Sequence, residues 1–436
     1  MKDFMKISMK IIILPLTFLI AGAASGQDTM RTFKSSFLFF MLLSGIFTFY
    51  FNGFSQSKSD PAIPDDRNVP VIELNGNGYE RGLQHGQQLK SEIAEVFAKW
   101  KENIGLTTKR NADSVLAEFL TATNFKPAIE KWTPDLMEEV KGLADGSGQK
   151  FVDVFSFQLV DEFWVYLDRI ANKNRDHCSG IGVSASKNHP AYIAQNMDLE
   201  NFMQGYQTLL HVMGTASEPE QYILTCAGLI VTTGMNGNGI GVCANTLMEL
   251  QACEDGLPVA FLIRGILSKQ DGSAALSFLK TATHASGQNY ILGIQDSVYD
   301  FEASAKQVIR FYPEGTNGDI VYHTNHALIN HDVKPWYSEY HRKVLNGEMK
   351  GMNSALRFAS LAKRLIRPLE EISPDVIKST LRSKDNENYP VCRTYKEGGG
   401  GFTFSSVLYT LTGRRSVQVT YGSPDQSEYQ EHFFKE

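Results

Sequence analysis

The hydrophobic pattern of this chain changes from helical to strand-like near Asn172, and that change limits the folds the chain can adopt. Before it, over residues 79–170, apolar residues recur every three or four positions with charged residues between them. This is the pattern of helices that bury one face. Thr133 followed by Pro134 marks the start of one such helix, and Gly148 marks its end. Residues 79–170 are therefore predicted to form an all-helical block.

Beyond Asn172 the sequence consists of short segments rich in β-branched residues and separated by turns, which is typical of strands. A helical pair is predicted at residues 258–283, polar helices across 336–382, and a closing hairpin at 402–422 that turns at Gly413. Consecutive antiparallel strands with segregated helices favour an α+β fold, layered αββα, over a doubly wound parallel sheet. The other predicted strands lie at residues 180–186, 191–198, 207–215, 221–227, 288–296 and 307–312.

Two apolar runs, each preceded by basic residues, stand near the start of the chain at residues 11–24 and 37–51. Both are shorter than the roughly 20 residues that a helix needs to cross a membrane, which argues against an anchor. A short apolar run behind basic residues is typical of a secretory signal. Because two signals in series make little physical sense, we hypothesise that Met30 is the true start. Residues 1–56 are predicted to be a leader that is removed on export to the periplasm or the extracellular space, with no stable membrane insertion afterwards.

The composition favours a folded protein that does not bind nucleic acid. Of the 436 residues, 42% are hydrophobic, which is enough for a sizeable core and excludes intrinsic disorder. The chain has 48 acidic residues against 42 lysines and arginines, for a net charge of −6. This balance argues against a DNA or RNA partner.

Motifs that would assign the chemistry directly are missing from the sequence. There is no GxSxG, P-loop, HExxH or paired CxxC pattern. The glycine cluster at residues 234–241 lacks the spacing of a dinucleotide-binding loop and is predicted to be an Asn-Gly turn before a strand. His323, His326 and His331 lie close together, but no carboxylate-rich motif accompanies them. Neither a metal nor a cofactor is predicted.

The five cysteines differ in their surroundings, and one of them is a candidate nucleophile. Cys226, Cys243 and Cys253 lie in or beside apolar strands and are expected to be small buried hydrophobes. Cys178 instead lies among polar residues, where the helical block ends and the first strand of the sheet begins. The sequence leaves the disulfide state of Cys226, Cys243, Cys253 and Cys392 open, including a Cys243–Cys253 pair across a turn.

A set of short strings, in order along the chain, resembles one protein family, the penicillin acyltransferase-like branch of the N-terminal-nucleophile hydrolases. The resemblance extends from about Val69 to the C-terminus. It implies a four-layer αββα sandwich preceded by a helical segment. The strings are YERGLQHG (79–86), DHCSGIGVSA (176–185), QNMD ending at Asp198, GMNGNGIGVCANT (234–246), HTNH (323–326) and VCRTY (391–395).

The resemblance also implies self-processing. A precursor of this family cuts itself before the cysteine, here between His177 and Cys178, so that Cys178 acquires a free α-amine. The helical segment 57–177 and the sandwich segment 178–436 then stay associated. A thiol with a reference pKa of about 8.5 is mostly protonated at neutral pH, whereas an N-terminal amine with a reference pKa near 7.7–8.0 is partly neutral and already tethered beside it.

Roles for four more residues follow from their positions in the family strings. Asp198 would orient the new amine and stabilise its charged form. The side-chain amide of Asn325 would hold the tetrahedral oxyanion, and Asn245 matches a second pocket asparagine of the related bile-salt hydrolases. Arg393 matches an active-site arginine that would stabilise the thiolate. An aspartate at a turn, a strand-end asparagine and a solvated surface arginine are the ordinary alternatives for Asp198, Asn245 and Arg393.

The sequence departs from the family at two places. Bile-salt hydrolases have an arginine in the slot that Gln195 or Asn196 would fill here, which argues against a bile-acid substrate. His177 stands where a glycine is often found before the nucleophile, which puts the efficiency of self-cleavage in question.

Together these features predict an exported thiol enzyme that cleaves linear amide bonds of small N-acyl substrates through an acyl-thioester on Cys178. Export away from the coenzyme A pool favours hydrolysis over acyl transfer to an amine. A self-cleaving peptidase with no further turnover and an inactive binding protein on the same fold remain as alternatives.

Overall fold

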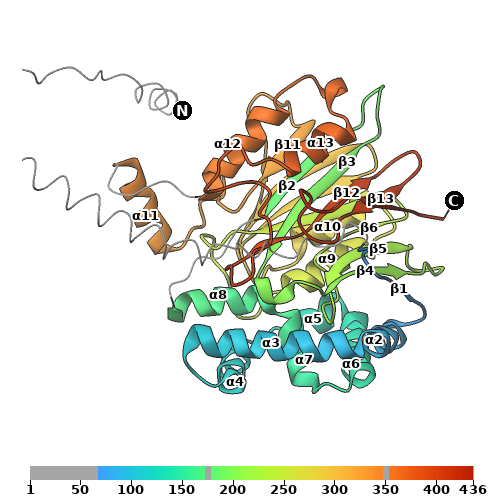
Figure 1. Ribbon diagram of the computed structural model, residues 1–436, viewed down its shortest axis with the longest axis vertical. Coiled ribbons are helices and arrows are strands. Elements are labelled where there is room, and N and C mark those ends of the chain that lie inside the picture. The colour runs from blue at the N-terminus through green and yellow to red at the C-terminus, as the bar shows by residue number, and fades with distance from the viewer. Residues whose placement is uncertain (1–66, 172–177, 347–352, 436) are drawn as a thin grey trace, which may run out of the picture. The chain divides into compact units, whose positions relative to one another are not determined.

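The computed structural model describes residues 67–171, 178–346 and 353–435, and within them two β-sheets lie face to face with helices on both outer sides (Figure 1). The four-layer αββα arrangement confirms the predicted α+β fold. The predicted leader, residues 1–56, and the residue His177 lie outside the described residues. Within the described part of the chain, every helix is too short or too polar to span a lipid bilayer.

The larger sheet has eight strands in the order β1-β4-β5-β6-β7-β8-β9-β10. All neighbouring strands are antiparallel except β1, which pairs in parallel with β4. The predicted Asn-Gly turn is confirmed between β6 and β7, where the side chain of Asn236 accepts hydrogen bonds from the backbone of Asn238 and Ile240. The strands are β1 (Val71–Leu74), β4 (Gln207–Val212), β5 (Gln221–Cys226), β6 (Thr233–Asn236), β7 (Ile240–Thr246), β8 (Gln288–Ile294), β9 (Ser297–Ala303) and β10 (Val308–Phe311).

The smaller sheet has six antiparallel strands in the order β11-β2-β3-β12-β13-β14. Its central strands β2 and β3 contact β7, β8 and β9 of the larger sheet. The closing hairpin predicted at residues 402–422 is formed by β12 and β13. The strands are β2 (Ser179–Val183), β3 (Tyr192–Leu199), β11 (Ile320–His323), β12 (Phe402–Thr410), β13 (Ser416–Val419) and β14 (Gln430–Phe433).

Successive side chains of a strand point to opposite faces of its sheet, so the apolar residues form two layers of core. Ile291 of β8, for example, packs between the two sheets, whereas its neighbour Leu292 packs against the helices that cover the larger sheet. On the opposite side, β2 and β11 of the smaller sheet pack on α12 and α13. The covering helices are α9 (Val259–Leu267) and α10 (Gly272–Thr281) on the larger sheet, and α12 (Asn353–Leu365) and α13 (Pro374–Leu381) on the smaller one; α11 (Pro335–Leu345) precedes α12.

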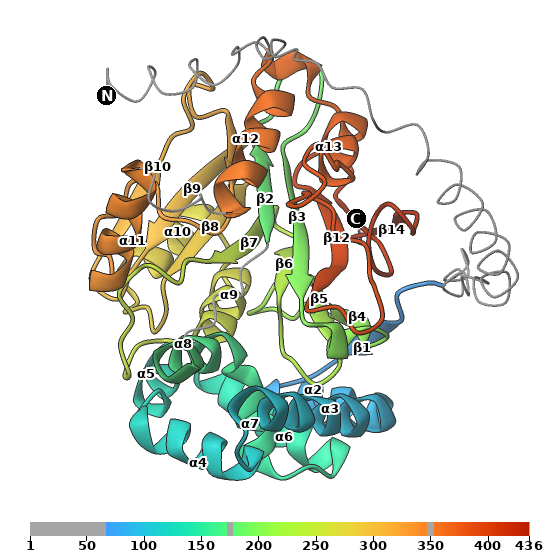
Figure 2. The same cartoon turned by 60° about the vertical axis from the view of Figure 1, so that its left-hand side comes forward.

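The predicted helical block is present as seven helices that gather at one end of the sandwich (Figures 1 and 2). Its apolar face joins the same core as α9 and the outer face of the larger sheet. The predicted interval omitted β1, which precedes the block and connects it to the sheet through β4. The helices are α2 (Gly78–Gln88), α3 (Lys90–Thr108), α4 (Ala112–Ala122), α5 (Lys126–Trp132), α6 (Pro134–Ser147), α7 (Phe151–Gln158) and α8 (Val160–Ala171).

A buried group of charges connects this block to the sandwich. Glu139 of α6 accepts hydrogen bonds from Arg81 of α2 at 3.1 Å and from both terminal nitrogens of Arg264 of α9 at 2.6 and 2.9 Å. All three side chains are buried. A buried ion pair needs good geometry and additional hydrogen bonds to offset its desolvation, and here the carboxylate is shared by two guanidinium groups from separate layers.

Glycines bring α2 and α6 into direct backbone contact. A Cβ placed at Gly82 would lie 1.8 Å from the carbonyl oxygen of Glu139, and one placed at Gly142 would lie 2.0 Å from that of Tyr79. Backbone atoms cannot move aside as a flexible side chain can, so these positions require glycine.

Gly82→Ala is therefore expected to destabilise the protein by about 1–3 kcal/mol or more, because the added methyl group forces the two helices apart. The matched control is Gly105→Ala in α3, where the nearest atom to an added Cβ lies 3.7 Å away. That variant should keep or slightly raise stability, since alanine favours a helix. Urea unfolding of both variants measures the difference, and equal stabilities would contradict the close packing.

Candidate active site

Cys178 lies directly before strand β2, which in the smaller sheet lies between the edge strand β11 and β3. Two glycines in β2 let the larger sheet approach it. A Cβ at Gly180 would lie 2.8 Å from Cδ1 of Ile291 and 3.0 Å from Nδ2 of Asn245, and a Cβ at Gly182 would also crowd Ile291. The CSGIGV sequence thus places a thiol at the start of a strand whose glycines present no side chain to the larger sheet.

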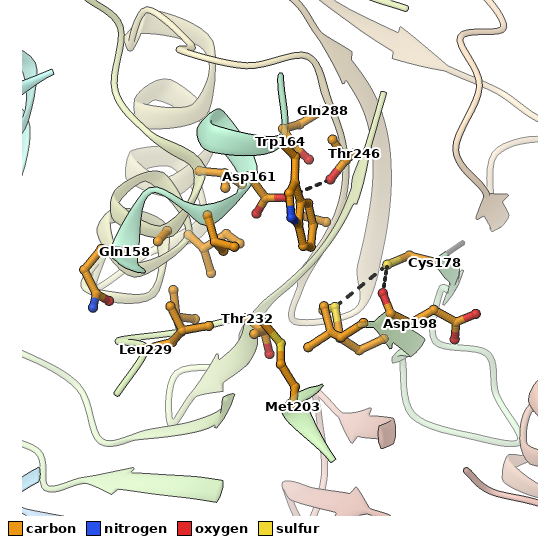
Figure 3. Close-up of a pocket in the computed structure, with 18 of the residues that line it drawn as sticks. Gln158, Asp161, Trp164, Cys178, Asp198, Met203, Leu229, Thr232, Thr246 and Gln288 are labelled. Carbon is orange, nitrogen blue, oxygen red and sulfur yellow. Dashed lines mark hydrogen bonds between the residues drawn. The ribbon is translucent and has the colours of Figure 1, made fainter. Parts of the chain in front are cut away.

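The thiol of Cys178 is partly buried and faces a pocket (Figure 3). Its Sγ lies 3.8 Å from the carbonyl oxygen of Asp198 and 3.8 Å from Sδ of Met197. Burial, with the negative charge of Asp198 as a smaller contribution, raises the pKa of the Cys178 thiol well above its usual range. In the intact chain this sulfur is therefore protonated at neutral pH and is a weak nucleophile.

Asp198 ends in a carboxylate that has only one partner among the described residues. Its Oδ1 accepts a 2.7 Å hydrogen bond from the hydroxyl of Thr403, which is the residue opposite it on β12. Its Oδ2 is buried and has no hydrogen-bond donor from the described part of the chain. Burial raises the pKa of Asp198 to about 7, against the opposing effects of Arg393 and Thr403. A cation beside Oδ2 would hold this carboxylate in its charged form.

Arg357 of α12 is the largest fully buried polar side chain at the site, and it was not among the residues predicted from the sequence. Its fully buried guanidinium donates to the carbonyl oxygen of Cys178, to the hydroxyl of Ser179 at 3.0 Å and to Oδ1 of Asn325 at 2.9 Å. One side chain therefore fixes the backbone at the thiol and the orientation of the Asn325 amide. The sequence contains a signal for its burial: Ser354, Arg357 and Leu361 are spaced by three and four residues, which places them on the same, buried face of α12.

Asn325 follows β11 and lines the same pocket as Cys178. Its Nδ2 donates to the carbonyl oxygen of Thr246 at 3.0 Å, while Arg357 holds its Oδ1. A side-chain amide has two N–H groups, so one remains for a ligand in the pocket. The backbone N–H of Asn325 donates to Ser354, which further fixes its position.

Asn245 lies behind the pocket, between the two sheets. Its Oδ1 accepts from Gln195 at 3.2 Å, and its Nδ2 donates to Asn289 at 2.6 Å. Asn289 in turn donates to Asp300, so Asn245 belongs to a buried polar chain. Its sequence neighbours line the pocket, whereas Asn245 itself does not.

Arg393 lines a second pocket next to the first, together with Asp198, Glu200 and the glycines at residues 399–401. Its Nη1 is buried and without an acceptor among the described residues. The charge of Arg393 opposes the rise in the pKa of Asp198, while Arg357 acts on both Asp198 and the Cys178 thiol. Among the described residues, the charge of Arg357 lowers the pKa of the Cys178 thiol, which is the effect predicted for Arg393. The role of Arg393 stays a prediction.

The pocket at Cys178 is lined mainly by apolar side chains. Side chains from the helical block form one wall and strands β3 and β7 form another. Its lining suits a hydrocarbon group attached close to a polar reaction centre. The apolar lining residues include Val160, Met203, Leu229, Val231, Val259, Ala260 and Ile263.

Two of the clustered histidines, His323 and His326, form hydrogen bonds within the protein. One ring nitrogen of His323 lies 3.0 Å from Glu302 and the other 2.7 Å from the carbonyl oxygen of Thr324. The carboxyls of Asp300 and Glu302 outweigh burial and raise the pKa of His323 to about 9. Among the described residues no three His, Cys, Asp or Glu side chains are grouped to hold a metal ion, and all five cysteines are free thiols.

A family model for acyl-coenzyme A:6-aminopenicillanic acid acyl-transferase matches residues 184–426, which is more than half of the chain. The chain belongs to this family. The predicted family is thereby confirmed, and the matched range contains Asp198, Asn245, Asn325 and Arg393. It begins six residues after Cys178, so the cysteine itself lies outside the match.

Two curated relatives come from Dictyostelium discoideum. The chain is 26% identical to protein dcd1A over 235 residues, 47% of this chain and 51% of the relative. It is 24% identical to protein dcd1B over 226 residues, 47% of this chain and 43% of that relative. The chain thus spans about half the length of the curated relatives it matches.

Three solved structures are also similar, at low TM-scores. An N-acylethanolamine-hydrolyzing acid amidase ortholog from Caenorhabditis elegans has a TM-score of 0.34 at 15% identity, covering 53% of this chain and 92% of that one. A conjugated bile acid hydrolase from Clostridium perfringens has 0.37 at 11%, covering 59% and 97%. Penicillin V acylase from Agrobacterium tumefaciens has 0.32 at 16%, covering 56% and 82%. At TM-scores this low, the likenesses carry no argument about fold or function.

A buried carboxyl on α8 gives a pH-dependent test of how this helix packs against α9. Glu162 of α8 accepts from the backbone of Val259 at 3.0 Å and from Ser286 at 2.7 Å, and its other oxygen has no partner in the described residues. Burial, with the charge of Asp161, raises the pKa of Glu162 to about 7. The folded protein therefore binds this proton more tightly than the unfolded chain, so stability falls as pH rises from about 4.5 to about 7.

Glu162→Gln removes this loss and keeps the two accepted hydrogen bonds. Relative to wild type, the variant should gain stability between pH 5 and pH 8, by no more than about 3 kcal/mol. Urea unfolding at the two pH values measures the change, with the exposed Glu102→Gln as control. A difference between variant and wild type that stays constant with pH, or shifts the other way, would contradict the buried carboxyl.

Proposed function

We propose that this protein cuts its own chain between His177 and Cys178 and then uses the freed N-terminal cysteine to hydrolyse linear amide bonds of N-acyl compounds. The proposal rests on one observation: the thiol of Cys178 and the side-chain amide of Asn325 line one pocket whose other walls are mostly apolar. Membership of the acyl-transferase family supports acyl chemistry at this site.

The base in this proposal is the α-amine of Cys178 itself. The thiol needs a proton acceptor because its surroundings raise its pKa. An α-amine with a reference pKa near 7.7–8.0 can accept that proton at neutral pH. Oδ2 of Asp198, which has no hydrogen-bond partner among the described residues, is available to bind the resulting ammonium group. Arg357 donates a hydrogen bond to the carbonyl oxygen of Cys178. This bond fixes the backbone of Cys178 and so keeps its amine close to its sulfur.

The proposed reaction proceeds in two steps. The amine takes the thiol proton, and Sγ attacks the amide carbon, forming a tetrahedral oxyanion that accepts a hydrogen bond from the remaining N–H of Asn325. The carbon–nitrogen bond breaks as the ammonium returns its proton to the leaving amine, which leaves an acyl-thioester on Cys178. Water, deprotonated by the same amine, then attacks the thioester, releasing the carboxylic acid and the thiol.

Acyl transfer uses the same thioester with an amine in place of water. Hydrolysis remains the choice for a protein that is exported, because export separates it from acyl-coenzyme A. Export itself, with residues 1–56 as the removed leader, and association of the two processed segments are parts of the proposal. A small N-acyl amide is its only proposed partner.

Cys178→Ala should abolish both processing and amidase activity, because it removes the attacking sulfur. Wild type is expected to yield chains of 121 and 259 residues, covering 57–177 and 178–436, whereas the variant stays in one piece. Mass spectrometry of the purified proteins and a panel of fatty-acyl amides and N-acyl amino acids measure the two effects. Cys253→Ala, which changes a partly buried thiol outside the pocket, is the control and should behave as wild type. A processed or active Cys178→Ala protein would contradict the proposal.

Asn325→Ala should lower kcat by about 10²–10³-fold with a smaller change in KM, since the lost donor acts mainly on the oxyanion. Steady-state kinetics on the best amide of the panel measures both constants. Asn188→Ala, at an exposed turn, should leave them unchanged. A variant that loses affinity but keeps kcat would show that Asn325 binds the substrate rather than the transition state.

A further inference from the structure

A carboxyl group lies in the wall of the otherwise mainly apolar pocket that contains Cys178. Helix α8 places Asp161 there, next to Trp164, and Figure 3 shows both side chains at the pocket, across from Cys178 and Asp198. Nothing in the proposed hydrolysis uses this group. An acidic side chain facing hydrocarbon walls is costly unless something compensates it.

The compensation provided by the protein is small. Oδ1 of Asp161 accepts a 3.0 Å hydrogen bond from the hydroxyl of Thr246, and no ion pair to Asp161 is formed by any of the described residues. Burial raises the pKa of Asp161 to about 6, so the group is still mostly ionised at pH 7. Its charge also contributes to the raised pKa of the Cys178 thiol. A cation in the pocket would offset both effects.

Thr246 connects this carboxyl to the proposed oxyanion donor. The hydroxyl of Thr246 donates to Asp161 at 3.0 Å, while its carbonyl oxygen accepts from Asn325 at 3.0 Å. Asp161 and Asn325 thus both bind Thr246, and all three residues line the same pocket. An acyl chain whose carbonyl oxygen is held by Asn325 therefore extends into a pocket that also contains the carboxyl of Asp161.

The acyl part of a substrate fits this pocket better than the leaving amine does. The sulfur that keeps the acyl group lines it, and its other walls are mainly apolar. The neighbouring pocket, which shares Asp198 and Trp164, is lined by Glu200, Arg393 and a glycine-rich loop. That more polar space is open to the leaving amine.

We propose that Asp161 is a specificity-determining residue that selects amides whose acyl chain carries an ammonium group a few bonds from the scissile carbonyl. This inference rests on the proposed amidase function. The ammonium group supplies a positive charge that none of the described lining residues provides, and the methylene groups around it contact the apolar walls. The pairing brings the acyl chain across Thr246, with the carbonyl carbon next to the thiol.

The test compares matched substrates on wild type and Asp161→Asn. The substrates are amides of one reporter amine whose acyl chains carry an α-, γ- or ε-amino group, each with an isostere in which methyl replaces the ammonium. Wild type should favour at least one ammonium member over its isostere by tenfold or more in kcat/KM. Asp161→Asn keeps an acceptor for Thr246 and should abolish that preference, mainly through KM. Asp168→Asn, on the same helix outside the pocket, should keep it.

A binding measurement separates the failure of this inference from the failure of the amidase proposal. Ketones that carry the same acyl chains, with carbon in place of the leaving nitrogen, cannot be hydrolysed. Calorimetric titration should show that an ammonium ketone binds wild type at least tenfold more tightly than its isostere, and that Asp161→Asn removes the difference. If this holds but no amide is cleaved, only the amidase proposal fails. If isosteres bind and react as well as ammonium members at every chain position, the role of Asp161 is overturned.

Discussion

The buried guanidinium of Arg357 holds the candidate site together. It binds the carbonyl oxygen of Cys178, the hydroxyl of Ser179 and the side chain of Asn325, and so connects the beginning of β2 to the end of β11 through a helix from an outer layer. Neither strand alone defines where the thiol lies relative to an amide donor. The position of the pocket along the sandwich therefore depends on α12 packing against the smaller sheet.

The region around the thiol is unusual because it contains three carboxyl groups whose pKa values are raised by burial. Burial raises the pKa of Asp161 to about 6 and of Glu162 and Asp198 to about 7, and the thiol shares their surroundings. Each of these groups would be stabilised by positive charge. In the proposed mechanism, an α-ammonium on Cys178 provides it for Asp198, and a cationic acyl chain provides it for Asp161. In this account the site becomes electrostatically complete only after processing and substrate binding.

The sequence predicted the fold better than it predicted the side chains of the site. The change of period near Asn172 coincides with the end of α8 and the start of β2, because amphipathic patterns report directly which face is buried. Strand β1 was missed, since four residues paired with a distant strand carry little periodic signal. Arg357 and Asp161 were missed because their importance comes from which layers meet at them. The family strings contain Cys178, Asp198 and Asn325, which line one pocket, and Asn245 and Arg393, which lie beside it; the catalytic roles of all five stay predictions.

The most direct test of the account is mass spectrometry of an acid-quenched reaction with a cleavable N-acyl amide, followed by peptide mapping. The account predicts an acyl group attached through a hydroxylamine-sensitive bond to a peptide whose first residue is Cys178. An acyl group on another residue, or on Cys178 within a peptide still joined to His177, would contradict the claim that this sulfur works with its own terminal amine.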